Sequence, residues 1–266
     1  MHIARKLLLS FVGICLFCIV SSSHAEVISV GALDGGATAS PTLSFLWKGD
    51  QAKATLVMIP GGEGHIGLTP DKENLGGFYG NFLRPLSSSK LTSGIFNVVI
   101  FDSPSPLATG TTYPTSRATA DHLMRIETVV KFYKEKYKKP VWLLGHSNGA
   151  VSVTEFYKYL QKNHQEDLVS GIVYSSGRNG AEFGPNTNLP VLFLAHENDA
   201  CPKSTNASSL AEYKKLQEGN KQSEYVVLKT GEPEFRDPCR SGYHMYFNAY
   251  EEAYKAIDAF AGAMLK

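Results

Sequence analysis

A serine stands between two glycines in the sequence GHSNG at residues 145–149. The apolar run 141–144 before it predicts a buried strand, and residues 150–160 after it predict a helix. A tight turn between such a strand and such a helix exposes a serine hydroxyl for nucleophilic attack, and glycines leave room for the turn. Ser147 is therefore the candidate nucleophile, and a serine that merely lies between two turn glycines is the alternative.

A serine hydroxyl is a poor nucleophile without a general base, and a histidine held by a carboxylate is the common solution. Asp199 lies just past the apolar run 191–195, and His244 lies in a glycine-containing loop before the last predicted helix. Serine, acid, histidine is the order along the chain that this strand–turn–helix arrangement requires. We therefore predict a catalytic triad of Ser147, Asp199 and His244.

Other residues compete for two of these roles. Glu197 and Asp237 remain alternative acids, and a surface position without a catalytic part is the alternative for His244. The remaining histidines that we considered fit the role of base less well, because two lie too near the serine turn or the acid loop and two precede the serine. These four are His146, His196, His65 and His122.

Two backbone amides are needed to stabilise the negative oxygen of a tetrahedral intermediate. One would come from Asn148, the residue after the nucleophile, at the positive end of the following helix. The other would come from the loop PGGEGHIG at residues 60–67, after the predicted strand 54–59. We favour Gly62 or Glu63 as this second donor, with a simple glycine turn as the alternative.

Apolar runs that resemble strands alternate with helical patterns after residue 40. We predict strands at residues 42–47, 54–59, 96–101, 141–144, 171–174, 191–195 and 224–228. A long helix capped by Thr115 or Ser116 would end at Lys139-Pro140, and further helices are predicted at 150–160, 208–217 and 246–265.

Strands buried on both faces and separated by helices indicate an α/β protein, with a mainly parallel central sheet and helices on both faces. Strands 42–47 and 54–59 are joined by the short segment KGDQAK, so we expect them to add an antiparallel pair at one edge. The segments between strands are short, which leaves no room for a large cap domain.

The first 25 residues have the pattern of an export signal. Arg5 and Lys6 precede the apolar run 7–20, and Ser23-His24-Ala25 supplies the small residues of a cleavage site. A retained N-terminal membrane anchor is the alternative. We predict a periplasmic or secreted protein in which residues 26–266 form a single domain.

Two of the four cysteines fall in this predicted signal, which leaves Cys201 and Cys239. In an oxidising compartment such a pair is typically bridged, and the chain-entropy model gives the bridge roughly 3–4 kcal/mol. Two buried free thiols are the alternative. Because Cys201 follows Asp199 and Cys239 precedes His244, a bridge would tie the acid loop to the histidine loop.

The overall composition is that of a globular protein rather than of a nucleic-acid or membrane-surface binder. The chain has 266 residues, of which 43% are hydrophobic and 19% charged, and its formal net charge is +1. The basic residues are scattered, so we expect neither nucleic acid nor an anionic membrane as a partner. No cysteine or histidine spacing indicates a metal site, and we expect no cofactor.

At this point the chain resembles the α/β-hydrolase superfamily. The segments MIPGGEG, GHSNGA, HENDAC and CRSGYHMY occur in the superfamily's order and extend over most of residues 26–266. The chain is most similar to a group of small exported bacterial serine hydrolases without a large cap, in which a pattern like HxxDxC carries the acid. The resemblance also extends to Arg117 and His122, which it implies have a structural role, by packing or hydrogen bonding near the site.

The function that we expect is hydrolysis of an acyl bond through an acyl-enzyme, most simply of a carboxylic ester, with amides, thioesters and peptides as further candidates. The partner would be a small-molecule acyl substrate, and the oligomeric state is not indicated. Loops 75–86 and 103–114 are predicted to border the pocket. The rival hypothesis is a non-catalytic binding or scaffold protein on the same fold, because a fold does not guarantee a function.

Overall fold

The computed structural model describes residues 26–30, 41–69, 91, 94–108 and 113–265 of the chain. The predicted export signal at residues 1–25, the loop 75–86 and residues 109–112 lie outside the described residues. No helix in the described ranges is both long enough and apolar enough to cross a membrane.

One eight-stranded sheet organises these residues, in the strand order β1-β2-β4-β3-β5-β6-β7-β8. Its strands are β1 (Glu26–Val30), β2 (Thr42–Trp47), β3 (Ala54–Ile59), β4 (Phe96–Asp102), β5 (Val141–His146), β6 (Gly171–Ser175), β7 (Val191–His196) and β8 (Ser223–Leu228). From β4 to β8 every neighbouring pair is parallel. The prediction of a mainly parallel sheet is confirmed.

The predicted pairing of the first two strands is wrong. β2 and β3 are not neighbours, because β4 lies between them and pairs antiparallel with β2 and parallel with β3. The antiparallel edge is instead formed by β2 with β1, a strand that we did not predict. All six residues of β3 are buried, and a strand covered on both sides belongs inside a sheet rather than at its edge.

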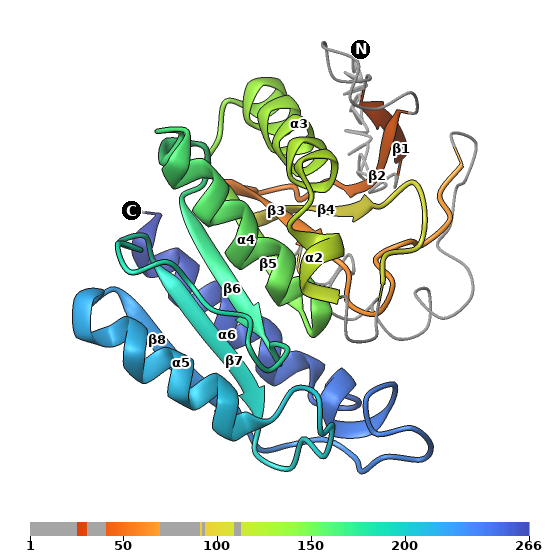
Figure 1. Ribbon diagram of the computed structural model, residues 1–266, viewed down its shortest axis with the longest axis vertical. Helices are drawn as coiled ribbons and strands as arrows, with labels where there is room; N and C mark the ends of the chain where they lie inside the picture. Colours follow the sequence, from red (N-terminus) through yellow and green to blue (C-terminus); the bar gives the residue numbers. More distant parts are fainter. Residues whose placement is uncertain (1–25, 31–40, 70–90, 92–93, 109–112, 266) are drawn as a thin grey trace, which may run out of the picture.

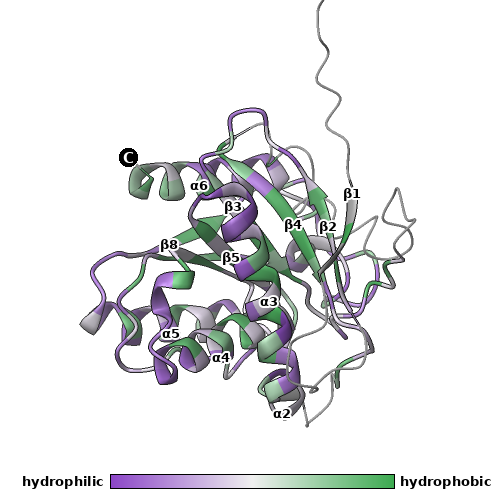
Figure 2. Ribbon diagram, turned by 90° about the horizontal axis from the view of Figure 1, so that it is seen from above, coloured by the Kyte–Doolittle hydropathy of each residue, from purple (hydrophilic) through white to green (hydrophobic). Residues whose placement is uncertain are grey.

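Helices cover both faces of the sheet, as expected from the sequence (Figure 1). They are α2 (Tyr113–Arg117), α3 (Ala120–Tyr137), α4 (Asn148–Lys162), α5 (Asn206–Gly219) and α6 (Tyr250–Met264). Alternate residues of β3 separate the two cores. Val57 and Ile59 pack with α3 and α4, whereas Leu56 and Met58 pack with α6 on the other face. Strand β4 is largely hydrophobic in Figure 2, whereas the helices carry both colours.

Two helix starts differ from the prediction. The N-cap of α3 is Thr119, whose hydroxyl accepts the amide proton of His122, so neither Thr115 nor Ser116 caps this helix. Helix α6 begins at Tyr250 rather than at residue 246. Tyr246 and Asn248 have φ angles of 55° and 59°, and a left-handed backbone interrupts a right-handed helix.

The carboxyl ends of the parallel strands lie at the same edge of the sheet, which is where open α/β sheets bind ligands. The residues that follow β3, β5 and β7 are the predicted oxyanion loop, Ser147 and the loop of Asp199. His244 reaches the same region from η3, a short 3₁₀ helix at Gly242–Met245. The topology therefore brings together residues that are far apart in the sequence.

Candidate active site

Ser147 lies on a strained turn between β5 and α4. Its φ and ψ angles are 55° and −121°, and such a conformation costs a non-glycine residue of order 1–3 kcal/mol. The flanking glycines are sterically required, as the sequence predicted. A Cβ atom on Gly145 would lie 2.5 Å from the carbonyl oxygen of Gly149, and one on Gly149 would lie 2.1 Å from the carbonyl oxygen of Ile59.

Asp199 and His244 meet in the interior, 45 residues apart in the sequence. Nδ1 of His244 lies 2.9 Å from Oδ2 of Asp199, and the two side chains are 0% and 1% exposed. The other carboxylate oxygen of Asp199 accepts the amide proton of Cys201 at 2.9 Å. Both oxygens are thus engaged, so the carboxylate holds a fixed orientation toward the imidazole.

The alternative acids occupy other positions. Glu197 is exposed and Asp237 is exposed at the pocket rim, where its carboxylate accepts the amide proton of Cys239. The histidines that we set aside also have other partners. His65 bonds Ser103, His122 bonds Ser152, His146 bonds Ser175 and His196 bonds Thr230.

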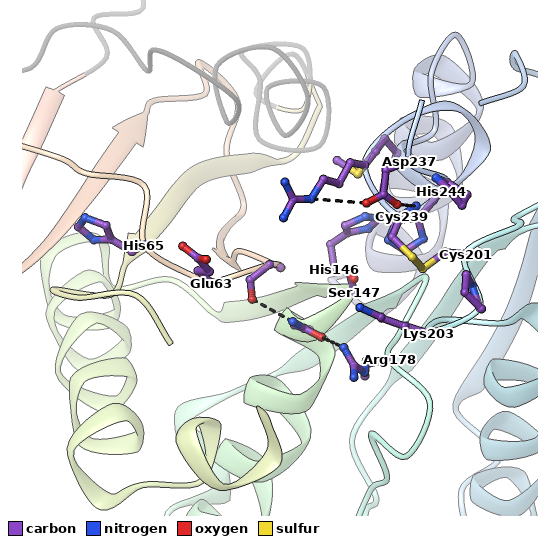
Figure 3. A pocket seen from close by; sticks show the side chains of 17 residues that line it. Glu63, His65, His146, Ser147, Arg178, Cys201, Lys203, Asp237, Cys239 and His244 are labelled. Atoms are coloured by element: carbon purple, nitrogen blue, oxygen red, sulfur yellow. Dashed lines mark hydrogen bonds and ion pairs between the residues drawn. A yellow bond between two sulfur atoms is a disulfide. The ribbon is translucent and has the colours of Figure 1, made fainter. Parts of the chain in front are cut away.

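Ser147 and His244 line one pocket of about 560 Å³ (Figure 3). Nε2 of His244 is buried and has no hydrogen-bond partner in the part of the chain that the structure describes. The structure therefore places the serine and the imidazole in the same cavity without joining them by a hydrogen bond. In substrate-free enzymes such bonds are often long and shorten only when substrate binds.

The three candidate oxyanion donors, Asn148, Gly62 and Glu63, line this same pocket. The carbonyl oxygen of Gly62 accepts hydrogen bonds from the Asn148 side chain and from Arg117, each at 2.9 Å. A trans peptide directs its N–H away from its C=O, so these two bonds also fix the direction of the Glu63 amide. The side chain of Asn148 thus connects the nucleophile turn to the oxyanion loop, in addition to the role predicted for its backbone amide.

Arg117 holds the oxyanion loop in place through hydrogen bonds to its backbone. The side chain is fully buried, and besides Gly62 it donates to the carbonyl oxygen of Pro60 at 3.3 Å and to the hydroxyl of Ser152 at 2.7 Å. His122 lies 2.9 Å from the same hydroxyl. Burial, aided by the charge of Arg117, lowers the pKa of His122 to about 3, so this imidazole is neutral. The pair has the structural role that the resemblance implied.

The far end of the same loop is held by Asp102, which the sequence analysis missed. Its carboxylate accepts the amide protons of Ile66 at 2.6 Å and of Leu68 at 2.7 Å. Burial raises the pKa of Asp102 above its ordinary value, although these amide donors act in the opposite direction. An acid at the carboxyl end of a predicted strand was the signal that could have identified it.

Cys201 and Cys239 form the expected disulfide, and both residues line the pocket. The bridge connects the loop that carries Asp199 to the segment that leads into His244 (Figure 3). It therefore lies where it can keep the acid and the histidine at a fixed separation.

Replacing both cysteines with serine is expected to destabilise the protein by about 4 kcal/mol, because the bridge closes a loop across a sequence separation of 38. For a domain of this size the melting temperature should fall by roughly 8–16 °C. Thermal unfolding with and without reductant measures the effect, and the double variant, which has no bridge to lose, is the control. A wild-type melting temperature that reductant leaves unchanged would contradict the prediction.

The sequence analysis did not predict the cations of the pocket, among them Arg178 and Lys203, and it considered His146 only as a possible base. Arg178 follows β6 and Lys203 follows β7, so their positions after strand ends were the available signal. The ring of His146 lies 5.0 Å from that of His244. Burial, and after it the neighbouring His244, lowers the pKa of His146 well below its ordinary value. The imidazole of His146 is therefore neutral and adds no positive charge next to His244.

Similarity to known proteins was found among solved structures. No family profile and no curated protein matches the chain. A dienelactone hydrolase from Anabaena variabilis shares 12% identity with a TM-score of 0.60, covering 91% of this chain and 98% of its own. An esterase from Pyrococcus furiosus shares 13% identity with a TM-score of 0.62, covering 92% and 94%.

A third solved structure is an α/β serine hydrolase without a lid from Xanthomonas campestris. It shares 11% identity with a TM-score of 0.59, and covers 90% of this chain and 94% of its own. Identities this low establish a common fold. The chain therefore has the α/β-hydrolase fold, without a large cap domain in the residues that the structure describes.

Proposed function

We propose that this protein is a serine hydrolase that cleaves an acyl bond, most simply a carboxylic ester, through Ser147, His244 and Asp199. One observation carries the proposal. A buried imidazole is held at Nδ1 by Asp199, and its Nε2 is left without a partner among the described residues, in the pocket that also contains the strained serine. A general base for a hydroxyl nucleophile requires this combination.

The proposed reaction begins with proton transfer. The carboxylate of Asp199 accepts the Nδ1 proton of His244, which assigns the lone pair of the neutral imidazole to Nε2. His244 then removes the proton of Ser147 as its oxygen attacks the carbonyl carbon of the substrate. Asp199 stabilises the imidazolium that forms, without accepting its proton.

The tetrahedral intermediate carries its negative charge on the former carbonyl oxygen. The amide of Asn148 and the amide of Gly62 or Glu63 would donate to that oxygen. When the intermediate collapses, His244 returns its proton to the leaving alcohol and an acyl group remains on Ser147. Water, activated by the same histidine, then releases the acid and restores the serine.

Two further points support the proposal. The similar solved structures include proteins described as esterases and as a serine hydrolase. A structural disulfide is typical of oxidising compartments, which favours the export that residues 1–25 predict. We therefore propose a periplasmic or secreted enzyme that acts on a small-molecule acyl substrate.

A fluorophosphonate probe tests the proposal directly, because it reacts covalently with activated serines. We expect stoichiometric labelling of the purified protein, with the modified peptide mapping to Ser147. Ser105→Ala removes an exposed serine that does not line the pocket, and should be labelled like the wild type. A folded protein that stays unlabelled and hydrolyses no p-nitrophenyl ester would favour the binding or scaffold protein instead.

A further inference from the structure

Two cationic side chains lie on one side of the pocket, beside the nucleophile. Figure 3 shows Arg178 and Lys203 next to Ser147, with Glu63 and His65 on the opposite side. Arg178 comes from the segment after β6 and Lys203 from the segment after β7. The proposed acyl transfer needs neither charge, because the triad and the oxyanion amides complete it.

Asn179 fixes the two segments to one another. Its amide N–H donates to the carbonyl oxygen of Lys203 at 2.9 Å, and its side-chain nitrogen donates to that of Pro202 at 3.0 Å. Its side-chain oxygen accepts the amide proton of Thr205 at 2.9 Å. The backbone of Lys203 is therefore held beside that of Arg178 by several hydrogen bonds.

The guanidinium of Arg178 is directed to the first turn of α4. Its Nη1 donates to the side-chain oxygen of Asn148 at 3.0 Å, and its backbone N–H donates to the carbonyl oxygen of Ser147 at 3.1 Å. Asn148 is also a candidate oxyanion donor. The guanidinium of Arg178 thus contacts Asn148, the residue that follows the proposed nucleophile Ser147.

The acidic residues of the pocket lie elsewhere. Asp237 is 3.9 Å from Arg240 at the rim, and Glu63 is on the opposite side of the pocket in Figure 3. Within the described ranges, no carboxylate lies within 4.0 Å of the ammonium of Lys203. Lys203 is exposed and lines the pocket from a segment that is hydrogen-bonded to that of Arg178, so an anion bound in the pocket would interact favourably with both cations.

We propose that Lys203 and Arg178 form an anion subsite for a substrate that carries a carboxylate or phosphate group close to its scissile acyl bond. This inference rests on the proposed hydrolase function and adds the substrate class. Lysine and arginine both bind such groups through charge-assisted hydrogen bonds. A negative charge on the substrate would then be placed at the Asn148 side of Ser147, away from Glu63.

The test compares two esters with acyl chains of equal length. Mono-p-nitrophenyl adipate ends in a carboxylate, whereas p-nitrophenyl hexanoate is neutral. We expect wild-type kcat/KM to be about tenfold higher for the anionic ester. Lys203→Met should remove this ratio and Lys203→Glu should invert it, whereas Lys214→Met, at an exposed position on α5 outside the pocket, should preserve it.

Calorimetry separates the subsite from catalysis. Adipate and inorganic phosphate would be titrated into the Ser147→Ala protein, with and without Lys203→Met, so that their affinities distinguish a carboxylate from a phosphate. Anion binding that weakens about tenfold in the Lys203→Met protein supports the subsite even if no ester is hydrolysed. Hydrolysis of both esters at equal rates, with no anion binding, would overturn the subsite and leave the hydrolase proposal standing.

Discussion

Replacing Ser147 with alanine is expected to lower kcat for ester hydrolysis by roughly 10⁵- to 10⁶-fold. The variant loses the atom that forms the acyl-enzyme, and His244 then has only water to activate. A small residual rate should persist, because the oxyanion amides still stabilise the charge on the carbonyl oxygen. Steady-state kinetics with p-nitrophenyl butyrate, at high protein concentration for the variant, measure the change.

The fold should survive this substitution. Alanine at the φ angle of 55° meets the same backbone strain as serine, and among the described residues no hydrogen bond of the serine side chain caps the helix. Thermal unfolding of the variant should therefore match that of the wild type, and Ser105→Ala again serves as the matched control. A loss of less than tenfold in kcat would assign the nucleophile to another residue.

Replacing Asp199 with asparagine is expected to lower kcat by about 10⁴-fold. Oδ2 of the buried carboxylate lies 2.9 Å from Nδ1 of His244, where it would accept the Nδ1 proton and stabilise the imidazolium. A neutral amide of the same size does neither, and it favours the imidazole tautomer whose lone pair faces away from Ser147. The measurement is the same ester assay, with circular dichroism to show that the variant is folded.

The two alternative acids supply the controls for this prediction. Asp237→Asn and Glu197→Gln alter exposed carboxylates that do not contact His244, so each should change kcat by less than about threefold, as expected for surface positions. A larger loss in either control than in Asp199→Asn would transfer the role of the acid to that residue.

Seven of the eight strands, all but β1, could be predicted because each is defined by its own residues. All six residues of β3 and all six of β5 are buried, and such runs are recognisable without knowing their neighbours. Strand pairing is not local, so the short segment between β2 and β3 suggested a hairpin that the fold does not form. β4, almost 40 residues later in the chain, occupies the place between them instead.

The candidate site likewise contains residues that the sequence predicted and residues that it did not. Ser147, Asp199 and His244 were identified from chain order and from their positions after predicted elements. The positions of Arg178 and Lys203 after strand ends indicated the correct edge of the sheet, but no sequence pattern shows the hydrogen bonds of Asn179 that join their two segments. The left-handed turns before α6 occur at tyrosine and asparagine rather than at glycine, so the start of that helix carried no recognisable signal.

In the proposed enzyme, the buried guanidinium of Arg117 determines when the oxyanion loop becomes ordered. It holds the carbonyl oxygens of Pro60 and Gly62 from below and joins them to Ser152 of α4. The loop that would stabilise the transition state is therefore assembled as part of the core. Its conformational entropy would then be lost before any substrate arrives, and each cycle of the proposed reaction would start from a surface that is already shaped for it.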